Sequence, residues 1–373
     1  AALGSEFGLS KTQGAPEITM RYQRALRQIG WVFACFWVMS LSHAAPTTDA
    51  GNEAFDDFPL PDEVRHPDWF SDSFLDLRED LAEAQREGKK GIAIYFGQKY
   101  CAYCQLQMDV NWGKEQDIVD YTRRYFNVIQ VDIWGSRELT DVQGNTLTES
   151  AFAEQQKTNF TPALIFYVDD GREALKLVGY YPPYKFRAAL HYVVGDHYKA
   201  ESLRDYLERA DPPPKFDLAD LNAQPFFENP PYMLDRRRFP GTRPLAVFFE
   251  QHDCHACDIL HSGALLDERV QRQIAGFDTV QLDMWSKTPV LTPDGQRLTA
   301  VEWAKQLGLF FAPTVVFFDE HGKEVMRIDS VARLYRLSGV LDYVTSKGYE
   351  KAPTFLRWRD IAGRSERAPH ATP

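Results

Sequence analysis

The chain has 373 residues, of which 44% are hydrophobic, and its formal net charge at pH 7 is −11. Two ordinary globular domains fit this length and apolar content, which excludes a largely disordered protein. The acidic balance argues against a broad surface for nucleic-acid backbones, so we expect no nucleic-acid partner.

The N-terminal segment carries the pattern of an export signal. Residues 4–7 resemble a cloning-site scar, and we interpret residues 1–19 as added or upstream residues before a natural start at Met20. Basic residues then precede an apolar run at 29–41, which is too short to cross a bilayer, and small residues follow it. The sequence therefore predicts a signal peptide over 20–44. The mature protein should begin near Ala45, be exported to the periplasm or elsewhere, and be soluble.

Four of the five cysteines form two pairs whose members are separated by two residues. The fifth, Cys35, lies inside the predicted signal peptide; a lipid anchor there is the alternative, which bulky Phe33 disfavours. In exported proteins cysteine pairs are usually structural disulfides. A link across two residues closes too small a loop to restrict the unfolded chain much, which favours a redox role instead. The pairs are Cys101 with Cys104 and Cys254 with Cys257.

The first domain is predicted over residues 68–198, after an exposed leader over 45–67. Apolar residues at helical spacing predict an amphipathic helix over 68–86, which Gly88 ends. Its candidate N-cap residues are Asp68, Ser71 and Asp72.

The stretch 92–104 is the centre of the first domain. Its apolar run predicts a strand, the chain turns at Gly97, and a helix follows. If Cys101 lies in the first turn of that helix, the unpaired N–H groups and the positive dipole end stabilise its thiolate, and Cys104 can reach back to it. This arrangement makes a reversible dithiol and disulfide.

Helices and strands alternate in the rest of the first domain. The stretch 127–134 is strongly β-forming and too apolar for a sheet edge, so we expect a central strand. Another strand, at 160–167, opens with Pro162. The other predicted elements are a helix to about residue 120 that breaks near Gly113, a turn at Gly144, a helix at 149–157, a hairpin over 169–178 and a helix at 186–194.

The second half repeats the first in constant register. Five landmarks, such as Gly144 with Gly295, recur 151 positions later, and the cysteine pairs recur 153 positions later. Such a repeat is a whole domain, far longer than a solenoid unit. The predicted organisation is therefore a connection at 199–234, broken by a run of three prolines, a second domain at 235–362 and a disordered tail at 363–373.

The order of these elements resembles a known fold. Each half resembles a thioredoxin domain in the order of its elements. This order is a strand, C-x-x-C at a helix start, a second strand, then a strand that opens with Thr-Pro or Ala-Pro, a hairpin and a final helix. The polar stretch with Gly144 and Leu147-Thr148-Glu149 is similar to exported thioredoxin-like proteins of the SoxW type. The resemblance implies an α/β fold of two tandem thioredoxin-like domains, each a central mixed sheet flanked by helices. It also implies a thiol-disulfide oxidoreductase that needs no cofactor.

The resemblance further implies roles for individual residues. In this family the first cysteine attacks a substrate disulfide and the second resolves the mixed disulfide. Cys101 and Cys254 are then the nucleophiles. Their partners Cys104 and Cys257 resolve the intermediate. The family's proline is cis and faces the cysteines, and the backbone before it pairs with the substrate chain; the corresponding residues are Thr161 with Pro162 and Ala312 with Pro313.

Departures from the family pattern affect the chemistry. The buried aspartate that usually precedes the first cysteine by six residues is replaced by Tyr95 and Phe248, so a proton acceptor must come from elsewhere or from water. Glu250 and His252 are candidates near the second pair, although either is more often an exposed loop residue. His255 lies within the second pair, where an imidazolium would stabilise the neighbouring thiolate, raise the potential of this centre and draw electrons from the first domain.

Other functions are compatible with paired cysteines. We expect no metal, because about 15–20 residues separate the pairs of a zinc ribbon and here each pair sits in its own domain. A binding module with structural disulfides, and a disulfide oxidase or isomerase, stay open. The SoxW resemblance favours a reductase of protein or small-molecule disulfides that receives electrons from a membrane thiol donor.

Overall fold

The computed structural model describes residues 57–169, 171–210 and 221–367. The predicted signal peptide with Cys35, and the residues before it, lie outside this part of the chain. Within the three described ranges, no helix is long and apolar enough to cross a membrane.

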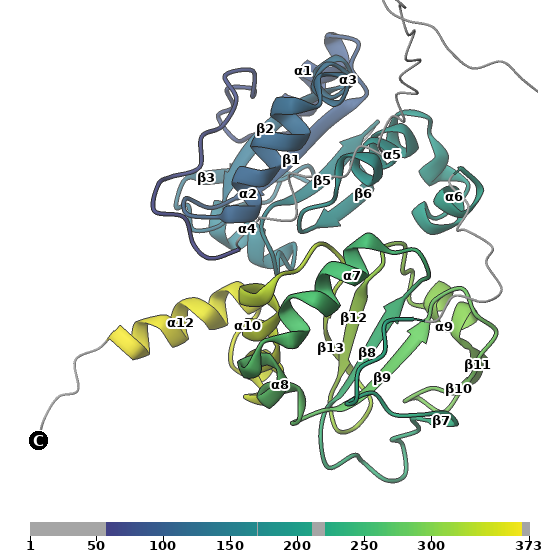
Figure 1. The fold of residues 1–373 in the computed structure, drawn as a ribbon. Helices are drawn as coiled ribbons and strands as arrows, with labels where there is room; N and C mark the ends of the chain where they lie inside the picture. Colours follow the sequence, from purple (N-terminus) through teal and green to yellow (C-terminus); the bar gives the residue numbers. More distant parts are fainter. Residues whose placement is uncertain (1–56, 170, 211–220, 368–373) are drawn as a thin grey trace, which may run out of the picture. The chain divides into compact units, whose positions relative to one another are not determined.

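The first half is built on a four-stranded mixed sheet with helices packed against it (Figure 1). Its central strand β1 (Gly91–Gly97) leads to the first cysteine pair. β1 pairs in parallel with β2 (Phe126–Asp132) and antiparallel with β5 (Ala163–Val168), which pairs antiparallel with β6 (Arg172–Val178). The remaining elements are α1 (Leu77–Arg86), α2 (Ala102–Leu106), the π-helix η1 (Gln107–Lys114), α3 (Gln116–Tyr125), a hairpin of β3 (Glu138–Thr140) and β4 (Thr146–Thr148), α4 (Glu149–Gln155), α5 (Pro183–Val194) and η2 (His197–Lys199).

The second half has the same strand order. β8 (Leu245–Glu250) leads to the second cysteine pair and lies between β9 (Asp278–Asp283) and β12 (Thr314–Phe318), and β13 (Glu324–Ile328) pairs with β12. The predicted repeat of a whole α/β domain is thus confirmed. The helices are α7 (His255–Ser262), η3 (Ala264–Leu266), α8 (Glu268–Ile274), α9 (Ala300–Gln306), α10 (Leu334–Thr345), α11 (Gly348–Lys351) and α12 (Phe355–Arg367).

The segment predicted as a connection contributes two elements. These are α6 (Leu203–Ala210) and the two-residue strand β7 (Tyr232–Met233). β7 pairs in parallel with β10 (Pro289–Leu291), which also forms a hairpin with β11 (Arg297–Thr299).

β2 is an edge strand, whereas its apolar sequence predicted a central one. Among the described strands it pairs with β1 alone. Main chain covers its open edge, because Ser71 N donates to Val128 O over 2.9 Å. At the same edge of the second sheet, Glu228 N donates to Thr279 O over 2.9 Å. A strand covered in this way can be apolar without exposing an unpaired hydrophobic edge.

The segments at the two ends of the described chain also differ from the prediction. α1 begins at Leu77 and not near residue 68, because Asp76 caps it by accepting hydrogen bonds from two main-chain N–H groups. Two residues of the predicted exposed leader, Asp57 and Val64, are buried. At the other end, α12 continues to Arg367, beyond residue 363, where a disordered tail was predicted.

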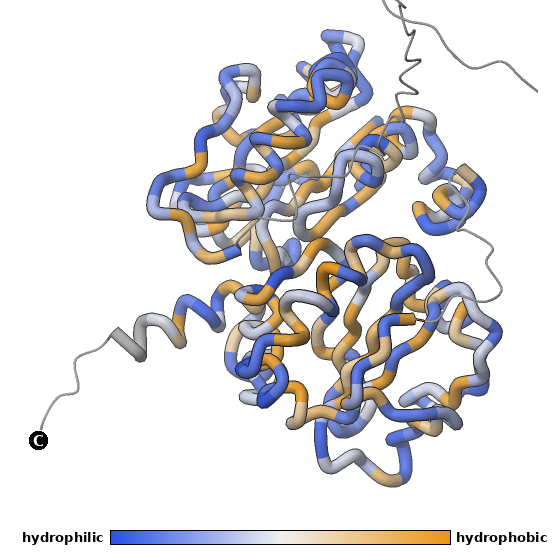
Figure 2. Tube along the Cα trace, in the orientation of Figure 1, coloured by the Kyte–Doolittle hydropathy of each residue, from blue (hydrophilic) through white to orange (hydrophobic). Residues whose placement is uncertain are grey.

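The alternation of side chains along β8 decides what faces helix α7. Ala246 and Phe248 pack in a cluster that includes Leu260 of α7, whereas Val247 packs in a separate cluster on the other face. Glu250 follows Phe248 by two positions and therefore shares the face toward α7. In Figure 2 the central strands of both halves are drawn largely in the hydrophobic colour. The sequence of β8 places Glu250 at the end of its otherwise apolar face.

Candidate functional site

Each cysteine pair lies where a central strand ends and a helix begins. Cys101 is the N-cap residue of α2, and its Sγ accepts a hydrogen bond from Cys104 N over 3.0 Å. Cys254 caps α7 in the same way, with Cys257 N 3.1 Å from its Sγ. The predicted position of the first cysteine at a helix start is confirmed for both pairs. The N–H groups at a helix start favour negative charge on that sulfur.

Both pairs form local disulfides, Cys101 with Cys104 and Cys254 with Cys257. The second cysteine of each pair is the more deeply buried. Cys104 and Cys257 are 0% and 1% exposed, against 7% and 8% for their partners. The first cysteine of each pair is therefore the more accessible of the two sulfurs.

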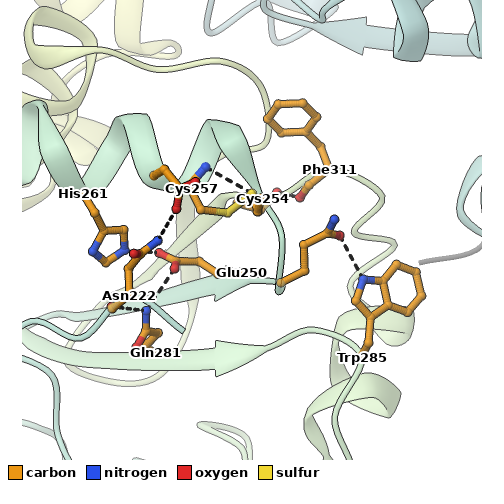
Figure 3. The surroundings of a disulfide bond; sticks show 11 residues. Asn222, Glu250, Cys254, Cys257, His261, Gln281, Trp285 and Phe311 are labelled. Carbon is orange, nitrogen blue, oxygen red and sulfur yellow. Dashed lines mark hydrogen bonds and ion pairs between the residues drawn. A yellow bond between two sulfur atoms is a disulfide. The ribbon is translucent and has the colours of Figure 1, made fainter. Parts of the chain in front are cut away.

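The prolines named from the sequence have the predicted peptide geometry. The Thr161-Pro162 and Ala312-Pro313 bonds are both cis. Thr161 Oγ1 lies 3.2 Å from Cys101 Sγ, so this segment borders the first disulfide. In the second half Phe311, which precedes Ala312, lies beside Cys254 (Figure 3).

A chain of hydrogen bonds leads to the first sulfur. Trp134 Nε1 donates to Gln98 Oε1 over 2.9 Å, and Gln98 Nε2 donates to Thr161 Oγ1 over 2.8 Å. Because the Thr161 hydroxyl already accepts from Gln98, its own hydrogen can point to Cys101 Sγ. These hydrogen bonds thus place a buried O–H donor beside Cys101, the nucleophile candidate of the first centre.

Among its described residues, the second half has only the first of these hydrogen bonds, the one between tryptophan and glutamine. Trp285 Nε1 donates to Gln251 Oε1 over 3.0 Å, as its counterpart does in the first half. Ala312 stands where the first half has a threonine, and alanine has no hydroxyl to donate. The two sulfur environments therefore differ by one hydrogen-bond donor.

The first disulfide borders a pocket of about 680 Å³. Tyr103, which lies within the pair, is buried, and the guanidinium of Arg336 stands 3.6 Å from its ring centroid and donates to Thr161 O over 3.1 Å. The Asp57 carboxylate accepts from Tyr103 Oη over 2.8 Å and from N of Tyr335 and Arg336, at the start of α10, over 2.9 Å each. Burial raises the pKa of Tyr103 well above its usual value, so this phenol stays a neutral donor.

An exposed histidine lies in sequence between the cysteines of the second disulfide, and a buried carboxyl group lies beneath the disulfide. His255, at the first position of α7, is exposed. Glu250 is 0% exposed, its Oε1 lies 2.8 Å from His261 Nε2, and its Oε2 accepts from Gln281 Nε2 over 2.9 Å. Glu250 is therefore no exposed loop residue. The other candidate named from the sequence, His252, instead pairs with a different carboxylate at 3.1 Å.

Comparison with known families identifies the repeat. The family described as "Thioredoxin-like domain" matches residues 77–194 and again residues 240–345. This chain belongs to the thioredoxin-like family. A comparison with curated proteins found no match.

Several solved structures resemble parts of this thioredoxin-like chain. A thioredoxin-fold protein from Helicobacter pylori is 22% identical, with 38% of this chain and 91% of that chain covered and a TM-score of 0.32. The reduced C-terminal domain of Neisseria meningitidis DsbD is 16% identical, with 29% and 84% covered and a TM-score of 0.22. Zinc-bound human ERp44 is 13% identical, with 76% and 58% covered and a TM-score of 0.21.

Two parts of the thioredoxin-like sites were not anticipated. His261 follows Cys257 by one helical turn, a spacing that places both on one face of α7 and could have suggested it. Thr161 was predicted only as a substrate contact, and nothing in the sequence indicated its bond to sulfur. Across the described ranges, no group of three or more His, Cys, Asp or Glu side chains is arranged to hold a metal ion.

Proposed function

We propose that this protein is an exported thiol-disulfide oxidoreductase with two redox centres that acts as a disulfide reductase. The observation that carries the proposal is the repeated placement of a C-x-x-C pair at a helix start, with the first sulfur capping the helix and bonded to the second. In the reduced state, the thiolate of Cys101 or Cys254 attacks a substrate disulfide. Cys104 or Cys257 then displaces the substrate thiol and closes the enzyme disulfide.

The proposed substrates are proteins or small molecules with accessible disulfides. The segments Thr161-Pro162 and Ala312-Pro313 are the proposed contacts for a substrate chain. The reductase direction, and a membrane thiol as the electron donor, rest on the SoxW resemblance. Export rests on the signal sequence at 20–44, and mass spectrometry of the protein from an exporting host should place its first residue near Ala45.

We propose an order of the two potentials that differs from the order predicted from the sequence. The sequence predicted that His255 raises the potential of the second centre, but this side chain is exposed, so water and salt screen its charge. In contrast, the Thr161 hydroxyl is buried beside Cys101, and the Glu250 carboxyl group is buried beneath the second pair, where negative charge disfavours a thiolate. We therefore propose that electrons flow from the second centre to the first.

An insulin-reduction assay with dithiothreitol as the donor tests the activity. The full chain should accelerate insulin reduction, and the double variant Cys101→Ser with Cys254→Ser should abolish the acceleration. In the full chain that retains residues 20–44, Cys35→Ser lies outside both pairs, is the matched control and should change nothing. If the unsubstituted chain gives no acceleration although both disulfides can be reduced and alkylated, the binding-module alternative with structural disulfides replaces the proposed function.

A further inference from the structure

A buried polar network lies beneath the second disulfide (Figure 3). Gln281 Nε2 donates both to Asn222 O over 2.8 Å and to Glu250 Oε2 over 2.9 Å, which fixes its amide orientation. His261 Nδ1 lies 3.3 Å from Gln224 Nε2, and His261 Nε2 lies 2.8 Å from Glu250 Oε1; in the tautomer with hydrogen on Nε2, Nδ1 accepts from the Gln224 amide and Nε2–H donates to Glu250. Both oxygens of Glu250 therefore accept hydrogen bonds, as an ionised carboxylate does.

Cys257 needs a nearby group that can take its proton. Only the thiolate of the resolving cysteine attacks a disulfide, and Cys257 is 1% exposed, so bulk water does not reach its sulfur. Glu250 lies at the end of β8 on the face toward α7, and His261 is one turn along α7 from Cys257. Figure 3 shows the carboxylate beneath the disulfide, between His261 and Gln281. Each of its oxygens keeps a lone pair for a further donor.

We infer that Glu250 is the proton acceptor for Cys257 and that His261 is the positioning residue that holds it. The inference rests on the proposed function. When a substrate sulfur is bonded to Cys254, the Cys257 proton moves to a Glu250 carboxylate oxygen, and the Cys257 sulfur forms a bond to Cys254 Sγ. The bond between Cys254 and the substrate breaks, and the substrate leaves as a thiolate that carries the electron pair. When a dithiol donor reduces the enzyme disulfide again, the proton returns from Glu250 to Cys257.

The first centre has no equivalent of this pair. Gly97 and Met108 occupy the positions of Glu250 and His261 relative to the cysteines. A Cβ atom on Gly97 would lie 2.7 Å from the Tyr95 hydroxyl, so the tyrosine fills that space. Burial raises the pKa of Tyr95, which makes its phenol a poor proton acceptor at neutral pH. The first centre thus serves as a comparison that lacks the carboxylate, and its titratable neighbour is His66, whose ring centroid lies 5.5 Å from that of Tyr95 and whose pKa is lowered by burial.

The experiment separates the two chemical steps with 5,5′-dithiobis(2-nitrobenzoate), whose coloured thiolate is released once at attack and once at resolution. The full chain with Cys35→Ser, Cys101→Ser and Cys104→Ser is reduced and mixed with this reagent in a stopped-flow instrument. Glu250→Gln should slow the second release about a hundredfold or more at pH 7, the range for loss of a general base, and the deficit should shrink as pH rises. Attack by Cys254 should change much less.

Matched variants distinguish proton transfer from a structural effect. Glu268→Gln makes the same substitution at an exposed position of α8 and should leave the second release within about twofold, since exposed charges are screened. His261→Gln, which keeps an N–H donor, should retain more of the rate than His261→Leu. A Glu250→Gln second release as fast as that of the parent, with the same pH profile, would overturn the inference.

The pH profile of the unsubstituted centres decides the question even if Glu250→Gln does not fold. With Glu250 as acceptor, the Cys257 step should vary little from pH 6 to 8, whereas the Cys104 step, measured with Cys254→Ser and Cys257→Ser, should rise about tenfold per pH unit as the thiolate fraction rises. A tenfold rise per unit for Cys257 as well refutes the role of Glu250. Failure of either centre to release any coloured thiolate would instead refute the proposed function.

Discussion

Replacement of Thr161 by valine should lower the reduction potential of the first centre. The Thr161 hydroxyl accepts from Gln98 and is 3.2 Å from Cys101 Sγ, which leaves its hydrogen to donate to that sulfur. Reduction converts a weak acceptor, the disulfide sulfur, into a thiolate, which accepts the hydrogen bond strongly. The hydroxyl therefore stabilises the reduced form more than the oxidised form, and valine keeps the shape while removing the donor.

The size of the effect follows from the burial of this bond. Thr161 is 3% exposed, so water does not replace the lost donor. A hydrogen bond to a charged group contributes about 1.5–3 kcal/mol. Since 1.4 kcal/mol corresponds to about 30 mV for a two-electron couple, the potential should fall by about 30–60 mV. Redox titration of the full chain against dithiothreitol measures this potential. The chain carries Cys254→Ser and Cys257→Ser so that only the first centre responds.

Two substitutions serve as controls for this effect. Thr161→Ser keeps the hydroxyl and should retain most of the potential. Ala312→Thr, at the matching position of the second half, should raise the potential of the second centre if the new hydroxyl reaches Cys254. A Thr161→Val potential within about 10 mV of the parent, or an equal fall for Thr161→Ser, would show that the hydroxyl does not stabilise the thiolate.

Three further predictions concern single side chains. Asp57→Ala should lower the unfolding free energy by about 2–4 kcal/mol, because α10 loses a cap and the buried Tyr103 hydroxyl loses its acceptor; urea denaturation measures it, and an unchanged midpoint would contradict the capping role. His255→Ala should lower the potential of the second centre by less than Thr161→Val lowers the first; a larger shift on redox titration would restore the order of potentials predicted from the sequence. Burial raises the pKa of Asp80 from 3.8 to about 6, so its contribution to stability is fully present below pH 4 and is lost as pH rises through 6. Asp80→Asn should remove this loss, which is at most about 3 kcal/mol, and raise the unfolding free energy at pH 7. If the unfolding free energies of parent and variant, plotted against pH, stay parallel between pH 4 and 7, Asp80 does not cause the loss.

The sequence predicted the positions of the cysteine pairs and of the two prolines because local patterns determine them. An apolar run that ends in a turn places Cys101 and Cys254 at helix starts, and a proline that opens a strand marks Pro162 and Pro313. The constant spacing between the halves identified the whole-domain repeat. The helix start and the strand-opening proline can each be read within about fifteen residues of the cysteine or proline concerned.

The features that the sequence did not predict depend on residues far apart in the chain. The apolar run of β2 indicated burial, but burial at a sheet edge arises from the Ser71 main chain, which no periodicity reveals. Glu250 was named only as one of two candidates, because its burial depends on its contacts with Gln281 and His261. The hydrogen bond from Thr161 to sulfur joins residues 60 positions apart and exists only once the sheet has formed.

The contact between Asp57 and the start of α10 links the order of synthesis to the chemistry of the first pair. The bonded residues are 278 and 279 positions apart, so a growing chain exposes Asp57 and Tyr103 long before their partners at 335 and 336 exist. Contacts this distant in sequence form late. We therefore expect Cys101 and Cys104 to meet an oxidant while the surface around them is still open, so that the first disulfide can form before the second half of the chain has folded.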